Sequence, residues 1–105
     1  MASGQTADYK TIKIEREADG IVFLILNRPE KRNAMSPELH REMREALEEL
    51  ELDDSAKIVV LTGAGEAFSA GQDIKLYFRS TEDDPKARAR ARHDSHAWRW
   101  DRLSK

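Results

Sequence analysis

Apolar and polar positions alternate near the start of the chain, and this alternation predicts a strand. Isoleucine and a polar residue alternate over residues 11–16, which is typical of a strand with one face in water. Residues 19–20 read Asp-Gly, a two-residue turn signal, because glycine tolerates the positive φ of a tight hairpin. Residues 21–26 are all apolar, so we expect a second strand that is buried on both faces. These segments together predict a β-hairpin.

An amphipathic helix is predicted after a polar loop. Ser36 is a good helix cap, and Pro37 suits the first helical position, so the helix should begin there. We expect it to end near residue 52, before two aspartates. One face carries a stripe that we expect to lie in the core: Leu39, Met43, Leu47 and Leu50.

The rest of the chain adds one strand and two helices. Residues 57–62 predict a strand too apolar for the edge of a sheet, and a loop of small residues follows. The order of elements gives an α/β fold class in a single domain, with residues 1–8 as a disordered tail. We expect three further segments: a helix from Asp73 to residue 79, an exposed linker over 80–85, and a helix over 86–103.

The composition excludes several classes of site. The 105 residues include no cysteine, so disulfides, thiolate catalysis and cysteine-based zinc sites are excluded. The three histidines are scattered, and we predict no metal site. No run approaches the roughly 18 apolar residues of a membrane span. Because no secretory signal is visible either, we expect a cytoplasmic protein.

Positive charge gathers in residues 85–105, which carry seven basic and two acidic side chains. This tail also holds the side chains that a surface for single-stranded nucleic acid needs: Arg88, Arg90, Arg92, Trp98 and Trp100. Alternate spacing spreads the guanidinium groups around a helix, so a solvated helix is the favoured interpretation, and we expect no nucleic-acid partner. A dinucleotide site at Gly63 and Gly65 is rejected, since Phe68 stands where the third glycine would fall.

Two segments have the chemistry of a binding site. Lys31 and Arg32 lie between an apolar strand and a helix N-terminus, where phosphate groups bind readily. The loop over residues 67–73 is built of small residues and leads into a predicted helix. Small side chains let a ligand approach the backbone, whose free N–H groups can then bind a developing oxyanion. The residues alone thus indicate a surface for anions and carbonyl groups.

These two segments resemble the crotonase (enoyl-CoA hydratase/isomerase) superfamily. The motifs are Asn27-Arg-Pro followed by Lys31-Arg-Asn-Ala-Met, and Leu61-Thr-Gly followed by Phe68-Ser-Ala-Gly-Gln-Asp73. Within the superfamily the chain is most similar to the hydroxycinnamoyl-CoA (feruloyl-CoA) hydratase-lyases, through residues 27–37, 61–67 and 73–79. The resemblance implies the N-terminal part of a crotonase-type ββα spiral fold over residues 1–105.

The resemblance also implies the role of each site residue. Lys31 and Arg32 would lie near the phosphates of coenzyme A, and Ala34 along its pantetheine arm. The carbonyl of Ala70 would accept a hydrogen bond from the adenine. In the loop that follows, the resemblance implies an oxyanion donor in the backbone N–H of Gln72, structural roles for Gly71 and Asp73, and a contact between Tyr77 and the phenolic hydroxyl of the substrate.

The implied reaction is hydration of a 4-hydroxycinnamoyl-CoA and retro-aldol cleavage to an aromatic aldehyde, such as vanillin, and acetyl-CoA. No cofactor is expected, since coenzyme A is part of the substrate. The family's second oxyanion donor and acid–base carboxylate are expected outside this chain, so we expect it to be inactive alone. The completed protein is expected to form trimers or hexamers. Two alternatives stay open: a generic enoyl-CoA hydratase or isomerase, and a non-catalytic fragment with a polyanion-binding tail.

Overall fold

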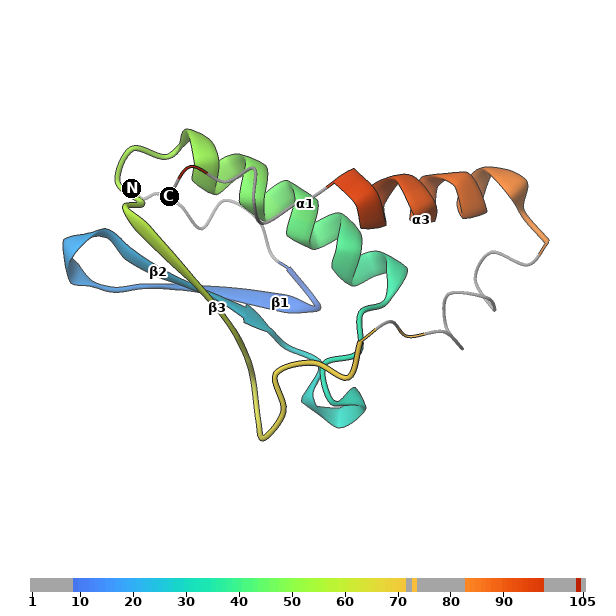
Figure 1. Cartoon of the computed structure of the whole chain (residues 1–105), viewed down its shortest axis with the longest axis horizontal. Helices are drawn as coiled ribbons and strands as arrows, with labels where there is room; N and C mark the ends of the chain where they lie inside the picture. The colour runs from blue at the N-terminus through green and yellow to red at the C-terminus, as the bar shows by residue number, and fades with distance from the viewer. Residues whose placement is uncertain (1–8, 72, 74–82, 98–103, 105) are drawn as a thin grey trace.

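The computed structural model describes residues 9–71, 73, 83–97 and 104. In Figure 1 a sheet lies on one side and helices on the other. The elements, in chain order, are β1 (Ile12–Arg16), β2 (Ile21–Leu26), α1 (Pro37–Leu52), β3 (Ile58–Gly63) and α3 (Pro85–Ala97). The expected tail at residues 1–8, and the helix expected after Asp73, lie outside the described residues.

The three strands form one sheet in the order β1-β2-β3. β1 and β2 are antiparallel, so the predicted hairpin is confirmed. Its turn is longer than the two residues expected, because Ala18 joins Asp19 and Gly20 in a 3₁₀ turn. The Glu17 N–H closes this turn by donating to the Ile21 carbonyl at 2.8 Å. Both Asp19 and Gly20 have positive φ, which explains the turn signal in the sequence.

β2 and β3 are parallel, and α1 makes the connection between them. Two parallel neighbours need such a crossover, because a short turn cannot bring the chain back to the starting edge. Their register pairs Leu26 with Gly63, so both strands end at the same edge of the sheet. The loops that follow the two strands therefore begin side by side, which places the candidate site.

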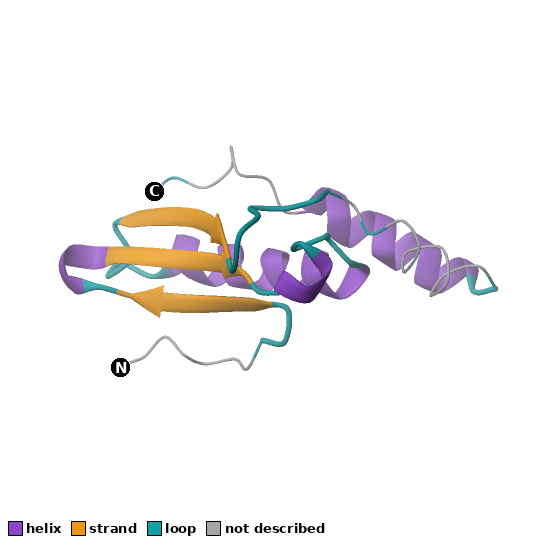
Figure 2. Ribbon diagram, turned by 90° about the horizontal axis from the view of Figure 1, so that it is seen from below, coloured by secondary structure: helices purple, strands orange, loops and turns teal. Residues whose placement is uncertain are grey.

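α1 forms as predicted and covers one face of the sheet (Figure 2). The Ser36 hydroxyl accepts the Leu39 N–H at 3.1 Å and caps the helix, and Pro37 occupies its first turn. The predicted stripe is buried against the inward side chains of β2, and the two sets form the core: Leu39, Met43, Leu47, Leu50, Val22, Leu24 and Leu26.

The expectation that β2 is buried on both faces is met only in part among the described residues. On the face away from α1, Ile25 is buried, whereas Ile21 and Phe23 are only half-buried. The expectation that β3 avoids the sheet edge is wrong for the described part of the chain, since β3 is the last described strand and Ile58 is 54% exposed. An apolar run indicates burial on both faces only where a second layer covers the strand, and no described element covers this face (Figure 2).

α3 begins at Pro85, so the expected linker over 80–85 ends earlier than predicted. Asp84 accepts the N–H groups of Lys86 and Ala87 at 3.1 Å each, which starts the helix. Asp94 is 3% exposed and accepts a hydrogen bond from Arg44 of α1 at 3.3 Å. The structure describes this helix as far as Ala97, and residues 98–103 of the predicted helix lie outside the described residues. Among the described residues, no helix has the length and apolar character to cross a membrane.

Glu42 fastens the N-terminal segment onto α1, a contact that the sequence does not reveal. Its carboxylate is 3% exposed and accepts both the N–H and the hydroxyl of Thr11, at 2.8 and 2.6 Å. The Lys10 N–H donates to the same carboxylate at 3.0 Å. Without Glu42, these donors would have no partner at a position that water reaches poorly. The contact therefore fixes the segment that leads into β1.

We predict that Glu42→Ala destabilises the protein by about 3 kcal/mol, because it leaves buried donors without an acceptor. Urea unfolding of the variant measures this change. The matched control is Glu45→Ala on the same helix, whose side chain is 41% exposed, and which should change stability by less than about 0.5 kcal/mol. Equal losses in the two variants would contradict the role given to Glu42.

Tyr9 gives the fold a dependence on alkaline pH. Burial, followed by the negative charges of Glu49 and Glu45, raises the pKa of Tyr9 from 10.0 to about 12. The unfolded chain therefore releases the phenolic proton first, and the stability from this group is present below pH 10 and lost as the pH rises through about 12.

We predict that unfolding free energy falls less steeply over this pH range in Tyr9→Phe than in the unchanged protein. Urea unfolding at a series of pH values measures this, and the same decline of the unfolding free energy in both proteins would refute the role given to Tyr9.

Candidate functional site

The candidate site is built from two loops that leave the same sheet edge. The first loop, residues 27–36, follows β2 and contains a 3₁₀ turn over Pro29–Lys31. The second loop, residues 64–71 with residue 73, follows β3. Figure 1 shows the two loops side by side below the sheet, at the start of α1. They bring together most of the residues that the sequence singles out.

Asn33 joins the two loops through its side chain, which is fully buried. Its Oδ1 atom accepts the Arg28 N–H at 2.8 Å within the first loop. Its Nδ2 atom donates to the carbonyls of Ala64 at 2.9 Å and Ala67 at 2.7 Å in the second. The amide thus uses its acceptor and both donors. The residue has a φ of 57°, in the left-handed region that asparagine tolerates better than most residues.

Main-chain hydrogen bonds continue this pairing along both loops. The Ala70 N–H donates to the Arg32 carbonyl at 2.9 Å. Met35 then bonds twice, donating its N–H to Gly71 at 2.7 Å and accepting the Asp73 N–H at 2.9 Å. The loops therefore form a short parallel ladder, which gives a segment without regular secondary structure a defined backbone.

Gly63 allows the second loop to fold back over the end of β3. A Cβ atom at this position would lie 2.3 Å from the Phe68 carbonyl oxygen and 2.6 Å from that of Ala67. It would also lie 2.8 Å from Asn33 Nδ2. Only glycine leaves room for these groups, so the close approach of the two loops depends on the missing side chain.

An ion pair closes the arrangement at the other end. The guanidinium of Arg28 contacts the Asp73 carboxylate at 3.1 Å, and both side chains are largely buried, at 11% and 15% exposed. The same guanidinium donates to the Ala34 carbonyl. Arg28 thus bonds to Ala34 within its own loop and to Asp73 at the end of the second loop.

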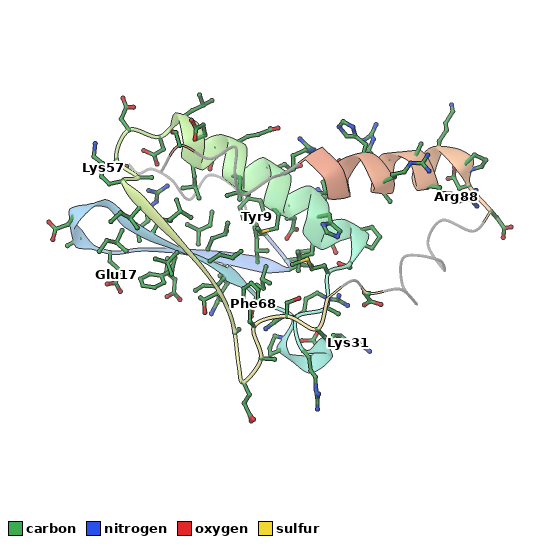
Figure 3. The ribbon with its side chains drawn as sticks, in the orientation of Figure 1. Tyr9, Glu17, Lys31, Lys57, Phe68 and Arg88 are labelled. Carbon is green, nitrogen blue, oxygen red and sulfur yellow. The ribbon has the colours of Figure 1, made fainter. Side chains whose placement is uncertain are left out.

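The structure places the predicted phosphate-binding residues on the outside of the first loop. Lys31 and Arg32 are both exposed, and Figure 3 shows Lys31 on the turn that projects below the sheet. Ala34 is half-buried, whereas Ala70 and Gly71 are exposed on the facing loop. The remaining predicted site residues, Gln72 and Tyr77, lie outside the described residues.

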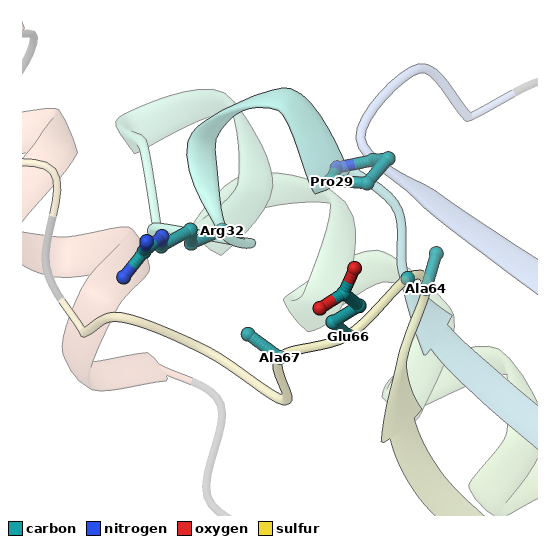
Figure 4. Close-up of a pocket in the computed structure, with 6 residues that line it drawn as sticks. Pro29, Arg32, Ala64, Glu66 and Ala67 are labelled. Atoms are coloured by element: carbon teal, nitrogen blue, oxygen red, sulfur yellow. The ribbon is translucent and has the colours of Figure 1, made fainter.

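A hollow of about 550 Å³ lies between the loops, lined by Pro29, Arg32, Ala64, Gly65, Glu66 and Ala67. Figure 4 shows the Glu66 carboxylate directed towards the turn at Pro29, with the Arg32 guanidinium turned away from it. The lining is mostly small side chains and main chain. No cluster of potential metal ligands occurs in the part of the chain that the structure describes.

Sequence reasoning missed the two residues that hold the site together, Arg28 and Asn33. Both belong to the first-loop motif. Arg28 and Asn33 bond to each other, and Arg28 also bonds to Ala34. Their other partners lie 31 or more residues away in the second loop. A usable signal was the asparagine in a turn, because asparagine favours the left-handed conformation. The partners themselves cannot be read from spacing.

We predict that Gly63→Ala destabilises the protein by about 3 kcal/mol, because the new Cβ displaces main-chain carbonyls that cannot move aside cheaply. Gly71→Ala is the matched control: Gly71 has a φ of 92° but nothing within 4 Å of an added Cβ. Conformational strain alone should then cost about 1 kcal/mol. Thermal and urea unfolding measure both. A Gly63 variant no less stable than the Gly71 variant would contradict the crowding.

The chain matches a family model over residues 16–103, and the family is described as Enoyl-CoA hydratase/isomerase. A hydroxycinnamoyl-CoA hydratase-lyase from Pseudomonas fluorescens is 55% identical over 93 residues, which cover 88% of this chain and 33% of that protein. A 1,2-epoxyphenylacetyl-CoA isomerase from Escherichia coli is 46% identical over 55 residues, or 52% and 21% of the two chains. The chain thus spans about a third or less of the length of these relatives.

Solved structures agree with this assignment. An enoyl-CoA hydratase/isomerase from Xanthobacter autotrophicus Py2 aligns with a TM-score of 0.65 and 37% identity, covering 70% of this chain and 27% of that one. Another from Mycobacterium paratuberculosis aligns with a TM-score of 0.61 and 41% identity, covering 65% and 25%. The resemblance seen in the sequence is confirmed, and the chain belongs to the enoyl-CoA hydratase/isomerase family, with part of the crotonase fold.

Proposed function

We propose that the whole protein hydrates a 4-hydroxycinnamoyl-CoA and cleaves the product to an aromatic aldehyde and acetyl-CoA. The observation that carries the proposal is the ladder between the two loops, which holds exposed main-chain groups beside a basic turn. The identity of 55% to a hydroxycinnamoyl-CoA hydratase-lyase supports this choice of reaction. We expect no separate cofactor, since coenzyme A belongs to the substrate.

Coenzyme A would lie across the first loop in this proposal. Lys31 and Arg32 are exposed and positively charged, so they suit the phosphate groups. Ala34 and Ala70 lie on facing loops with small side chains, which suits main-chain contacts to the pantetheine arm and to the adenine. The Ala70 N–H is already bonded to Arg32, whereas the adenine would use the Ala70 carbonyl.

The N–H of Gln72 is the proposed oxyanion donor. Gln72 itself lies outside the described residues, so the proposal rests on its neighbours Gly71 and Asp73, which both bond to Met35. An N–H at this position would bind the oxygen of a thioester carbonyl, as the family resemblance implies. We assign no acid–base carboxylate to this chain.

The chemistry follows from charge on that oxygen. Binding the carbonyl oxygen draws electrons from the conjugated double bond and makes the β-carbon electrophilic, so water adds there. The same oxyanion contact then stabilises the acetyl-CoA enolate, which forms when the β-hydroxyl loses its proton and the Cα–Cβ bond breaks to release the aldehyde. A proton added to Cα of this enolate completes acetyl-CoA. Tyr77 is proposed to hold the phenolic hydroxyl of the substrate and select 4-hydroxylated rings. The whole protein is proposed to be a cytoplasmic trimer or hexamer.

A generic enoyl-CoA hydratase or isomerase is the second candidate. It is favoured by the breadth of the match, since the relatives include an isomerase from Escherichia coli as well as the hydratase-lyase. The two candidates use the same carbonyl-binding loop. They differ in whether the carbon–carbon bond breaks and whether the phenolic hydroxyl is recognised.

We predict that the protein purified from its source forms vanillin and acetyl-CoA from feruloyl-CoA faster than it hydrates crotonyl-CoA. Tyr77→Phe should lower the ratio of these two rates by about ten-fold or more, because one specific hydrogen bond is lost. Tyr9→Phe is the matched control, since Tyr9 packs beside α1, and it should leave the ratio unchanged. Aldehyde absorbance and acetyl-CoA are measured. Faster turnover of crotonyl-CoA, without aldehyde, would establish the second candidate instead.

A further inference from the structure

We infer that Arg28 is a positioning residue, which holds the oxyanion-binding segment of the second loop in register with the first loop. This inference rests on the proposed function, because it concerns how the proposed donor Gln72 is aimed. Arg28 touches no proposed part of the substrate. Its action passes through Asp73, which is next to the proposed oxyanion donor, and through Ala34, which is proposed to lie along the pantetheine arm.

The main chain of Arg28 is rigidly held. Its N–H donates to the Asn33 side chain at 2.8 Å. Its carbonyl accepts the N–H groups of Lys31 at 2.9 Å and Asn33 at 2.8 Å. Arg28 also follows directly on Asn27, whose N–H bonds to Thr11 of the hairpin at 2.8 Å. The backbone of Arg28 is therefore fixed to the sheet, which limits where its guanidinium group can lie.

The guanidinium reaches both loops at once. One terminal nitrogen donates to the Ala34 carbonyl, and the other contacts Asp73 Oδ2 at 3.1 Å. The planar group with several donors suits this bridging, whereas the ammonium group of lysine is a compact point charge. Because the Arg28 side chain is only 11% exposed, water competes little for these bonds.

This bridge holds Asp73, which follows the proposed donor Gln72 in the chain. Asp73 is held at its carboxylate by Arg28 and at its N–H by Met35, whose own N–H holds Gly71. Gly71 has a φ of 92°, and its own N–H donates to Ser69 Oγ at 3.0 Å. Loss of the guanidinium would remove the ion pair that holds the Asp73 carboxylate, and we expect the proposed oxyanion donor beside it to be aimed less well. A displacement of about 1 Å at a reacting group lowers the rate by as much as a hundred-fold.

The effect should fall on kcat more than on KM. An oxyanion donor bonds more strongly in the transition state than in the bound substrate, so misplacing it slows the chemical step. Lys31 and Arg32, the proposed phosphate contacts, are exposed and do not depend on the guanidinium of Arg28. A variant that only destabilised the fold would instead lower the active fraction and leave its response to pH and substrate unchanged.

The test compares Arg28→Met and Arg28→Lys in the protein purified from its source. The matched control is Arg16→Met, which removes another arginine–carboxylate pair, to Asp53 at 2.9 Å, on the hairpin. We expect Arg28→Met to lower kcat for feruloyl-CoA by roughly ten- to hundred-fold with KM changed less than about three-fold. Arg28→Lys should recover part of kcat, and Arg16→Met should keep the unchanged value. Active-site concentration is set by titration with a tight-binding thioester analogue.

Hydrogen exchange supplies a second readout that needs no turnover. Arg28→Met should speed exchange of the Asp73 and Ala70 amides by at least about ten-fold relative to Arg16→Met. If kcat and these exchange rates both stay at the unchanged values, the positioning role is overturned. Faster exchange with unchanged kcat overturns it as well, leaving only a structural bond. If the unchanged protein turns over no thioester, the proposed function fails, whereas the exchange rates still show whether Arg28 holds the loop.

Discussion

The buried side chain of Asn33 is the contact on which the candidate site depends. Its amide group bonds to Arg28 on its own loop and to Ala64 and Ala67 on the facing loop. A buried amide needs partners for its polar atoms, and this arrangement of the two loops supplies them. The contact also requires glycine at position 63, because any side chain there would force the loops apart.

The sheet topology makes that contact possible. β2 and β3 are parallel neighbours that end together, so their loops must begin at one edge. α1 then covers the sheet and begins directly after the first loop. The resulting surface presents main-chain groups and small side chains instead of a cluster of reactive ones. Such a surface suits binding of a thioester carbonyl, where charge is stabilised by fixed N–H groups.

The sequence predicts the parts of this structure that depend on local signals. Ser36 and Pro37 mark the start of α1 because capping and proline geometry act within one helical turn. The faces of β2 are not predictable in the same way, since Ile25 is buried on the face away from α1 whereas Phe23, on the same face, is half-buried. The loop motifs singled out Lys31, Ala34 and Ala70, whose roles stay predictions. The roles of Asn33 and Glu42 depend on partners about 31 residues away, which no local pattern specifies.

The central claim is that the two loops are locked together before any ligand binds. The most direct measurement is the crystal structure of the protein from its source, free and with coenzyme A. We predict that Asn33 bonds to Ala64 and Ala67 in both forms, and that coenzyme A lies against Ala34 and Ala70 without moving either loop. Loops that separate in the free form, or coenzyme A bound elsewhere, would contradict the account.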